Sequence, residues 1–488
     1  MRLPSFFSGP VCADGQLCLA RASASGRLTG VAAAVALALL PMQLVSAQER
    51  SLSLADALKT AAYEHPSVSA RVKERAAAEV RLEIAEQQKL PALVGQSGVD
   101  GLGNRTATIR VEQALWTGGR ITGEVASAQA GIRRADHTIG TAQSDIMLKV
   151  LNAFTELARV QARQEVARAN VDEHLRLAQM IQRRVESNIS PASDGVLANA
   201  RFVQARAELN QLESLAIRAR STLSQAVGRP VGAIALPEQR DMEQYSLEVL
   251  LKAAMDYSPS LQQLGAELDV ARADIDIKKS ATLPQVKLRV DRTVGGNMPN
   301  TQAYVALEYQ TGAGLSSYTA ISEAQARADA LSLQVESARR ELIDQVSADW
   351  ADHKSYVVQA RDLEKQVQST TEVFDSFIRQ YAVGRKGWTD VLNAQREVAQ
   401  ARYQLADATW GQLRAAVRLQ ILTGMVSPEN TMLVQSRDQT RSFALSDKPE
   451  KPKKQEADAA TIGAPVAEAS PVSPVPQLTP TPLPRTGW

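Results

Sequence analysis

Cysteine and histidine are scarce in this sequence of 488 residues. The only cysteines are Cys12 and Cys18, both before residue 47, and the four histidines are scattered singly along the chain. Cysteine and histidine clusters with short, regular spacing are the usual signature of a zinc site. The sequence therefore argues against a Cys/His metal centre, and we predict no cofactor.

Aromatic residues and an excess of either charge are also missing. Aromatics make up 4% of a chain that is 44% hydrophobic, and 55 basic residues face 53 acidic ones for a net charge of +2. Few large rings and many small apolar residues favour long helices packed closely side by side. Interleaved charges predict a mixed solvated surface and no nucleic-acid partner.

No apolar run is long enough to cross a bilayer as a helix. The longest, residues 31–40, follows Arg21 and Arg27 and precedes small residues that end at Ala47. A basic stretch, a short apolar run and small residues are typical of a secretory signal. We predict that residues 1–47 are removed on export. No cysteine follows the expected cleavage site, which argues against a lipid anchor.

The rest of the chain describes one pattern twice. We expect a first repeat at residues 48–229, a joint at 230–245 and a second repeat at 246–425, with the same elements recurring about 195 residues later. A tail at residues 426–488, disordered from about 447, follows. The matches include Leu54 with Leu247, Pro66 with Pro259, Pro91 with Pro284 and Gly228 with Gly424.

Each repeat contains one very long helical pattern. Apolar residues recur every three or four positions over residues 121–186 and again over 320–381. Sixty-odd residues at 1.5 Å each give a rod of roughly 90 Å, which no single globular domain can wrap. Shorter helices, expected at residues 195–227 and 390–423, return along about half of each rod.

Before each long helix the period changes from 3.6 to 2. Ala107, Ile109 and Val111 alternate with polar residues, so we predict strand hairpins at about residues 92–115 and 285–310. Four strands with one apolar face cannot close a barrel, and open edges are not tolerated in lipid. Three chains would supply twelve strands. The predicted fold class is therefore α plus membrane β-barrel: a tandem-repeat chain that gives four strands to a trimeric twelve-stranded barrel, and long helices to a periplasmic α-helical tunnel.

The bend after the second long helix is the most distinctive stretch of sequence. Gly384 interrupts the helical pattern within residues 381–396, and Thr389 with Asp390 offers oxygens to cap the next helix. A weaker copy of this stretch lies at residues 188–201. Together with the S-L-x-x-A-L start at residues 53–58, these features resemble the TolC family of outer-membrane efflux ducts. The motifs that carry the resemblance are Y-x-x-G-x-x-x-x-x-D-V-L-x-A from Tyr381 to Ala394 and L-W-T-G-G-R from Leu115 to Arg120.

The resemblance implies a homotrimer in outer-membrane lipid with a large periplasmic portion. It implies two further partners, a periplasmic adaptor (membrane fusion protein) and an inner-membrane ABC or RND transporter. The adaptor is expected to grip the two bends between helices, whose residues are Asn188, Ile189, Ser190, Pro191, Gly384, Arg385 and Gly387. Trp116 and Tyr309 are expected at the membrane interface.

The resemblance also implies a closed periplasmic gate. Tyr381 and Lys386 are expected to reach Ser193 and Asp194 of the other repeat. Asp390 matches the first of two acidic positions that ring the constriction, and Asn393 replaces the second. Three carboxylates in a narrow pore attract cations, so this substitution predicts a weaker cation preference.

Two other classes of protein are alternatives to a duct. An exported coiled-coil spacer without a pore explains the long helices but not the strand hairpins. An enzyme is disfavoured because no nucleophile with a base, metal cluster or phosphate loop occurs. For the cargo, the missing anchor cysteine and the W-T-G-G-R element favour type I protein secretion over small-molecule or multidrug efflux.

Overall fold

The computed structural model describes residues 51–99, 105–235, 242, 244–295, 300–310 and 312–429. The predicted export signal at residues 1–47, the turn at 101–104, part of the joint at 230–245 and nearly all of the tail from 426 lie outside the described residues.

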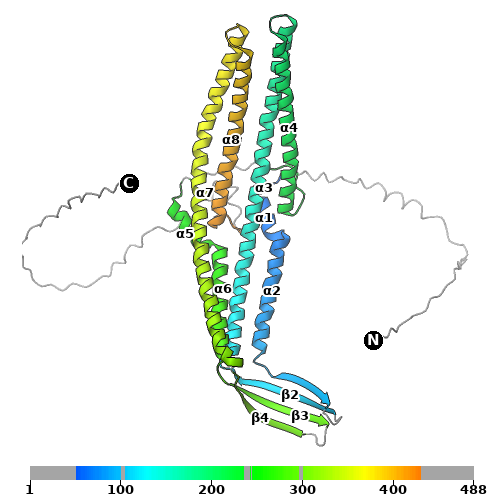
Figure 1. Cartoon of the computed structure of the whole chain (residues 1–488), viewed down its shortest axis with the longest axis vertical. Helices are drawn as coiled ribbons and strands as arrows, with labels where there is room; N and C mark the ends of the chain where they lie inside the picture. Colours follow the sequence, from blue (N-terminus) through cyan, green and yellow to red (C-terminus); the bar gives the residue numbers. More distant parts are fainter. Residues whose placement is uncertain are drawn as a thin grey trace, which may run out of the picture. The chain divides into compact units, whose positions relative to one another are not determined.

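The first half of the chain forms four helices and two strands (Figure 1). Ser53 caps the first helix by accepting a hydrogen bond from the Asp56 N–H at 3.1 Å. Pro66 opens the second helix, where its missing N–H would have had no helical partner. The elements are α1 (Leu54–Glu64), α2 (Pro66–Gln87), β1 (Ala92–Val99), β2 (Arg105–Trp116), α3 (Arg120–Glu186) and α4 (Ala192–Val227).

The second half has the same elements in the same order. α1 and α5 each have 11 residues, α2 and α6 each have 22, and α3 and α7 each have 67. The tandem repeat is therefore confirmed. The elements are α5 (Leu247–Tyr257), α6 (Pro259–Ser280), β3 (Gln285–Gly295), β4 (Asn300–Glu308), a 3-10 turn (Ala313–Leu315), α7 (Ser316–Ala382) and α8 (Trp388–Leu422).

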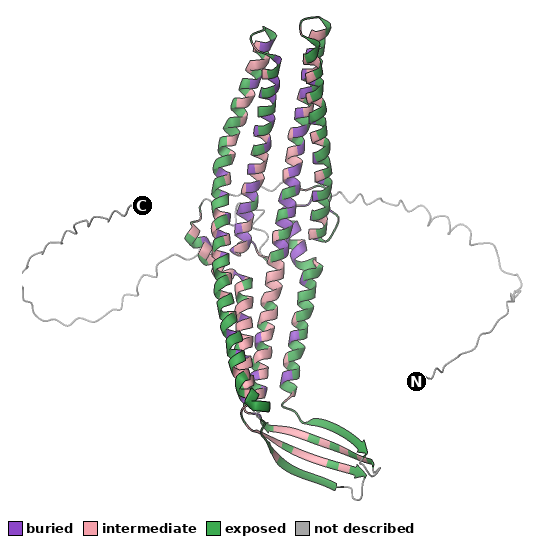
Figure 2. Ribbon diagram, viewed as in Figure 1, coloured by how far each residue is buried: buried purple, intermediate pink, exposed green. Residues whose placement is uncertain are grey.

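The long helices are about 100 Å long at 1.5 Å per residue. Toward the bends α3 packs against α4, and toward the sheet it packs against α2 and α6 (Figure 1). The core is densest halfway along, where α1, α3, α4 and α8 meet (Figure 2). Burial of each large apolar side chain there contributes about 1.5–3 kcal/mol. The innermost side chains are Leu58, Leu151, Phe154, Leu157 and Leu223.

The four strands form one antiparallel sheet in the order β1-β2-β3-β4. The central pair, β2 and β3, joins the two repeats, so β1 and β4 are the edges. The sheet lies at the end of the long helices that is opposite the bends (Figure 1). Among the described residues, no helix has the length and hydrophobicity needed to cross a membrane.

The returning helices begin earlier than the sequence pattern predicted. α8 begins at Trp388, after Gly387, and the Asp390 carboxylate accepts a hydrogen bond from the Gly387 N–H at 3.2 Å. Of the two residues predicted to cap this helix, Asp390 forms the cap. α4 begins at Ala192, so Ser193 and Asp194 lie within its first turn.

Candidate functional site

One face of the sheet is apolar and exposed. The strand register places alternate residues of all four strands on this face. The large apolar side chains on it are 38–73% exposed in the single chain. Although Arg292 also lies on it, opposite Ile109, an exposed and mainly apolar face of this kind marks a contact with lipid or another protein. These side chains are Leu93, Val99, Ile109, Val111, Leu288, Val294, Val305 and Leu307.

The opposite face of the sheet is polar and internally paired. Lys287 bridges Glu112 at 3.0 Å and Glu308 at 2.9 Å, thereby linking β2, β3 and β4. Arg110 of β2 makes a two-point contact with Asp291 of β3, at 2.7 and 3.2 Å. The sheet thus separates an apolar side from a charged side, as a wall between lipid and water requires.

Both predicted interface aromatics lie where the sheet meets the helices. Trp116 is the last residue of β2, and Tyr309 follows β4 directly. Their side chains are 48% and 55% exposed. A ring with an apolar body and one polar atom suits a membrane boundary. Their interface role stays a prediction.

The two bends share one backbone conformation. Asn188 (φ 55°) and Gly384 (φ 77°), matched by the repeat, both adopt the left-handed conformation that ends a helix. In each bend the next N–H returns to a helix carbonyl, from Ile189 to Arg184 at 2.8 Å and from Arg385 to Gln380 at 2.9 Å. The repeat therefore produces two loops of the same shape at the same end.

Tyr381 ties the second bend to the first. Its hydroxyl lies 3.1 Å from the Ser190 hydroxyl, and the Arg184 guanidinium stacks over its ring at 4.9 Å. The ring also packs against Trp388, with centroids 5.3 Å apart. Below it, Leu177 and Ile181 of α3 join apolar residues of α7 and α8 in one buried cluster.

The other predicted gate residues are less closely grouped within one chain. Lys386 stacks over Phe377 of its own hairpin, with its ammonium 4.4 Å from the ring centroid. Ser193 and Asn393 are exposed, and Asp194 is half-buried. The sequence identified Tyr381 but not its partner Ser190, because the repeat aligns that serine with Lys386. The contact of Tyr381 and Lys386 with Ser193 and Asp194 stays a prediction.

Sequence reasoning also missed a polar seam between α3 and α8. The Arg163 guanidinium lies over the Tyr403 ring at 5.0 Å and 3.3 Å from Asp407. Nearer the bends, the buried Gln395 side-chain amide donates a hydrogen bond to the side-chain oxygen Oδ1 of Asn170 at 3.0 Å. These pairs cross between hairpins more than 200 residues apart in sequence, so no local spacing signals them.

A small cavity of about 100 Å³ lies beside this seam, and His174 lines it together with Asn393. His174 is 6% exposed, and within the described part of the chain its Nδ1 has no hydrogen-bond partner. Burial lowers the pKa of His174, and Glu173 opposes the shift while Arg201 adds to it. The imidazole is therefore held neutral.

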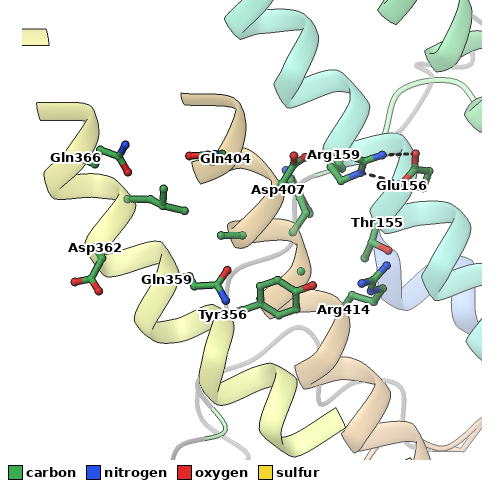
Figure 3. Close-up of a pocket in the computed structure, with 14 residues that line it drawn as sticks. Thr155, Glu156, Arg159, Tyr356, Gln359, Asp362, Gln366, Gln404, Asp407 and Arg414 are labelled. Atoms are coloured by element: carbon green, nitrogen blue, oxygen red, sulfur yellow. Dashed lines mark hydrogen bonds and ion pairs between the residues drawn. The ribbon is translucent and has the colours of Figure 1, made fainter. Parts of the chain in front are cut away.

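A larger polar groove of about 710 Å³ lies between α3, α7 and α8 halfway along the rod (Figure 3). Arg159 lines it and pairs with Glu156 at 2.7 Å and Asp407 at 3.0 Å. The Tyr356 ring covers Gly411 so closely that an added Cβ would lie 2.7 Å from it. Within the described residues, no group of three or more metal-ligating side chains occurs.

The comparisons with known proteins decide the family. A family model described as outer membrane efflux protein matches residues 57–229 and 250–425, one segment in each repeat. The chain belongs to this family. TolC from Vibrio cholerae is 23% identical over 63% of this chain and 74% of its own length. The cobalt-zinc-cadmium resistance protein CzcC from Cupriavidus metallidurans is 25% identical over 76% of this chain and 90% of its own length.

Solved structures agree with this assignment. The outer-membrane channel OprN superimposes with a TM-score of 0.69 at 17% identity, over 76% of this chain and 89% of its own. VceC from Vibrio cholerae gives a TM-score of 0.66 at 15% identity, over 76% and 96%. The predicted family, fold class and outer-membrane location of this efflux protein are confirmed. Its relatives are channels rather than enzymes.

Proposed function

We propose that this outer membrane efflux protein is the exit duct of a tripartite export system. It acts as a passive trimer that conducts cargo from periplasm to exterior. The observation that carries the proposal is the two-faced sheet with two open edges at one end of paired 67-residue helices. Open edges in lipid require pairing with further strands, and three copies give twelve strands.

Helix packing within the chain supports closure into a ring. α6 lies between the two long helices and packs against both α3 and α7. Its counterpart in the first repeat, α2, packs against α3 but not, within the described residues, against α7. The outer face of α2 leaves Val72, Val80 and Ile84 about half exposed, and α7 leaves Leu333 71% exposed. Placing α2 against α7 of a neighbouring chain would repeat the α6 environment and cover both surfaces.

The bends are proposed as the periplasmic gate and the adaptor contact. Tyr381, Ser190 and Arg184 hold the two hairpins of a chain together, as their contacts indicate. Tyr381 and Lys386 are proposed to reach Ser193 and Asp194 of the other repeat, with Asp390 and Asn393 lining the constriction. Ile189 and Val383, which are 64% and 68% exposed at the bends, offer an adaptor apolar contacts.

Type I protein secretion is the proposed cargo class. The alkaline protease secretion protein AprF from Pseudomonas aeruginosa is a relative, 22% identical over 62% of this chain and 66% of its own length. The W-T-G-G-R element favours the same class. The runner-up, small-molecule or metal-ion efflux, is favoured by the longer match to CzcC.

The duct is tested on the chain purified in detergent. Light scattering should give the mass of three chains, and planar bilayers should show discrete conductance steps. A monomer that conducts no ions would refute the proposal. Cargo is tested by deleting the gene: loss of a secreted protein from the medium supports secretion, whereas sensitivity to drugs or metals with unchanged secretion supports efflux.

A further inference from the structure

The polar face of the sheet carries equal numbers of positive and negative side chains in mutual contact. We call Arg110, Glu112, Lys287, Arg289, Asp291 and Glu308 the charge network. Like Lys287, Arg289 contacts both glutamates, Glu112 at 2.8 Å and Glu308 at 3.1 Å. Two cations and two carboxylates thus form one closed group across three strands.

The second group of the network lies one step further from the helices. Asp291 receives the Arg110 guanidinium and also accepts a hydrogen bond from the Tyr304 hydroxyl at 3.0 Å. Beyond it, Thr108 and Thr293 meet at 3.2 Å without charge. On the same face β1 contributes only Ala92, Val94, Gln96 and Gly98. Three positive charges therefore face three negative ones.

Pairing of this kind weakens the electric field away from the wall. Opposite charges about 3 Å apart act as short dipoles, whose field in water falls off faster than that of a single charge. The side chains of the network remain 17–46% exposed, so the face is wetted rather than sealed. An unbalanced wall would concentrate solutes of one sign instead.

We propose that the charge network makes the barrel end of the duct indifferent to the charge of its cargo, so that anionic and cationic solutes pass the outlet equally. The inference rests on the proposed function and adds that the outlet of the duct does not discriminate between cargoes by their charge. Strand pairing alone does not account for the network, because exposed ion pairs stabilise little. The Thr108–Thr293 contact also shows that the same strands pair without charges.

The local potential is measured with a single cysteine. The chain has no cysteine after Cys18, so Gln302→Cys places the only thiol of the exported protein on the polar face, opposite Asp291. In detergent-purified protein at low salt, its reaction rates with a cationic and an anionic methanethiosulfonate reagent are compared with those of a free thiol peptide. With the network intact, both rates should be changed by the same factor.

Single neutralisations should then unbalance the wall. A unit charge about 7 Å away in water changes the local concentration of a monovalent ion by roughly threefold. Asp291→Asn should speed the anionic reagent and slow the cationic one by about that factor, and Arg110→Gln should do the reverse. The double variant removes the same contacts but keeps the balance, so it should restore the original ratio. In 1 M salt all ratios should converge.

Three results would overturn the inference: a ratio already skewed more than threefold with the network intact, single variants that leave the ratio unchanged, or a thiol that neither reagent reaches. A network that only joins strands would lower thermal stability in all three variants without moving the ratio. Bilayer conductance of the same preparation is recorded in parallel. A conducting trimer with a skewed ratio refutes only this inference, whereas absent conductance refutes the duct itself.

Discussion

Removing the Tyr381 hydroxyl should loosen the contact between the two bends of a chain. The hydroxyl bonds to Ser190 and belongs to a side chain only 8% exposed, so Tyr381→Phe keeps the packed ring and loses one hydrogen bond. Such a bond contributes about 1 kcal/mol. Since 1.4 kcal/mol is a factor of ten, the population with parted bends should rise about fivefold.

Tyr381→Ala removes the ring as well, and with it the Arg184 stack and the apolar contact with Trp388. A stacked guanidinium adds about 0.5–1 kcal/mol at an exposed site, and truncating a buried aromatic ring to alanine costs about 3–5 kcal/mol. Only contacts that cross between the two hairpins affect how often the bends part. The population with parted bends should therefore rise more than in Tyr381→Phe, but less than the summed free-energy costs of the lost contacts would give. A rise of at least tenfold is expected.

Single-channel recording in planar bilayers measures the shift as open probability or mean conductance. Tyr63→Phe serves as the matched control, because this half-exposed ring lies on α1, away from the bends. The expected order is Tyr381→Ala, then Tyr381→Phe, with the control equal to the unaltered protein. If both Tyr381 variants conduct like the control, the contact does not hold the gate. If Lys386→Ala opens the channel as far as Tyr381→Ala, the contact proposed for Lys386 dominates.

Three further outcomes are expected. Gly123→Ala should lower the melting temperature, since its Cβ would lie 2.9 Å from an isoleucine of α6 and overpacking costs about 1–3 kcal/mol. Gly131→Ala in the same helix is the control: its Cβ would meet nothing within 4 Å, so this variant should be neutral or stabilising. Burial lowers the pKa of His174, so only the unfolded chain gains a proton as pH falls below about 6.5. The stability of the folded protein should therefore drop below that pH, and His174→Gln should flatten the profile of melting temperature against pH. Asn170→Leu should cost about 1–3 kcal/mol by stranding the buried Gln395 amide, while Asn170→Leu with Gln395→Leu should recover most of it in urea unfolding.

The sequence was sufficient for the architecture because each element has its own local signal. The apolar residues that recur every three or four positions along the long helices are buried or half-buried, among them Ile132, Val150 and Ile181 in the first and Val346 and Phe374 in the second. The strand alternation around Ile109 likewise predicted the apolar face of the sheet. Periodicity and proline breaks fix such elements within a few residues of chain, so no knowledge of the partners is needed.

Contacts between the repeats were beyond the sequence because nothing local encodes them. Arg163 touches Tyr403 and Asp407 only after α8 has returned beside α3. The serine opposite Tyr381 depends on the rotation of one hairpin about its axis, and a helix turned by one residue, about 100°, presents a different side chain. A motif therefore located the bend and the tyrosine, while packing chose Ser190.

The duplication copied the backbone of the bends but not their chemistry, and this difference bears on the proposed gate. Asn188 and Gly384 give both loops one shape, yet Ser190 stands in the first where Lys386 stands in the second. Only the second hairpin carries the buried ring that reaches across, to the Ser190 hydroxyl and the Arg184 guanidinium. In the proposed trimer, three chains with two hairpins each place six hairpins in a closed ring. If all six were equal, they would have to part together or not at all. Two unlike kinds, alternating round the axis and joined by a few polar contacts, allow one kind to swing while the other stays anchored.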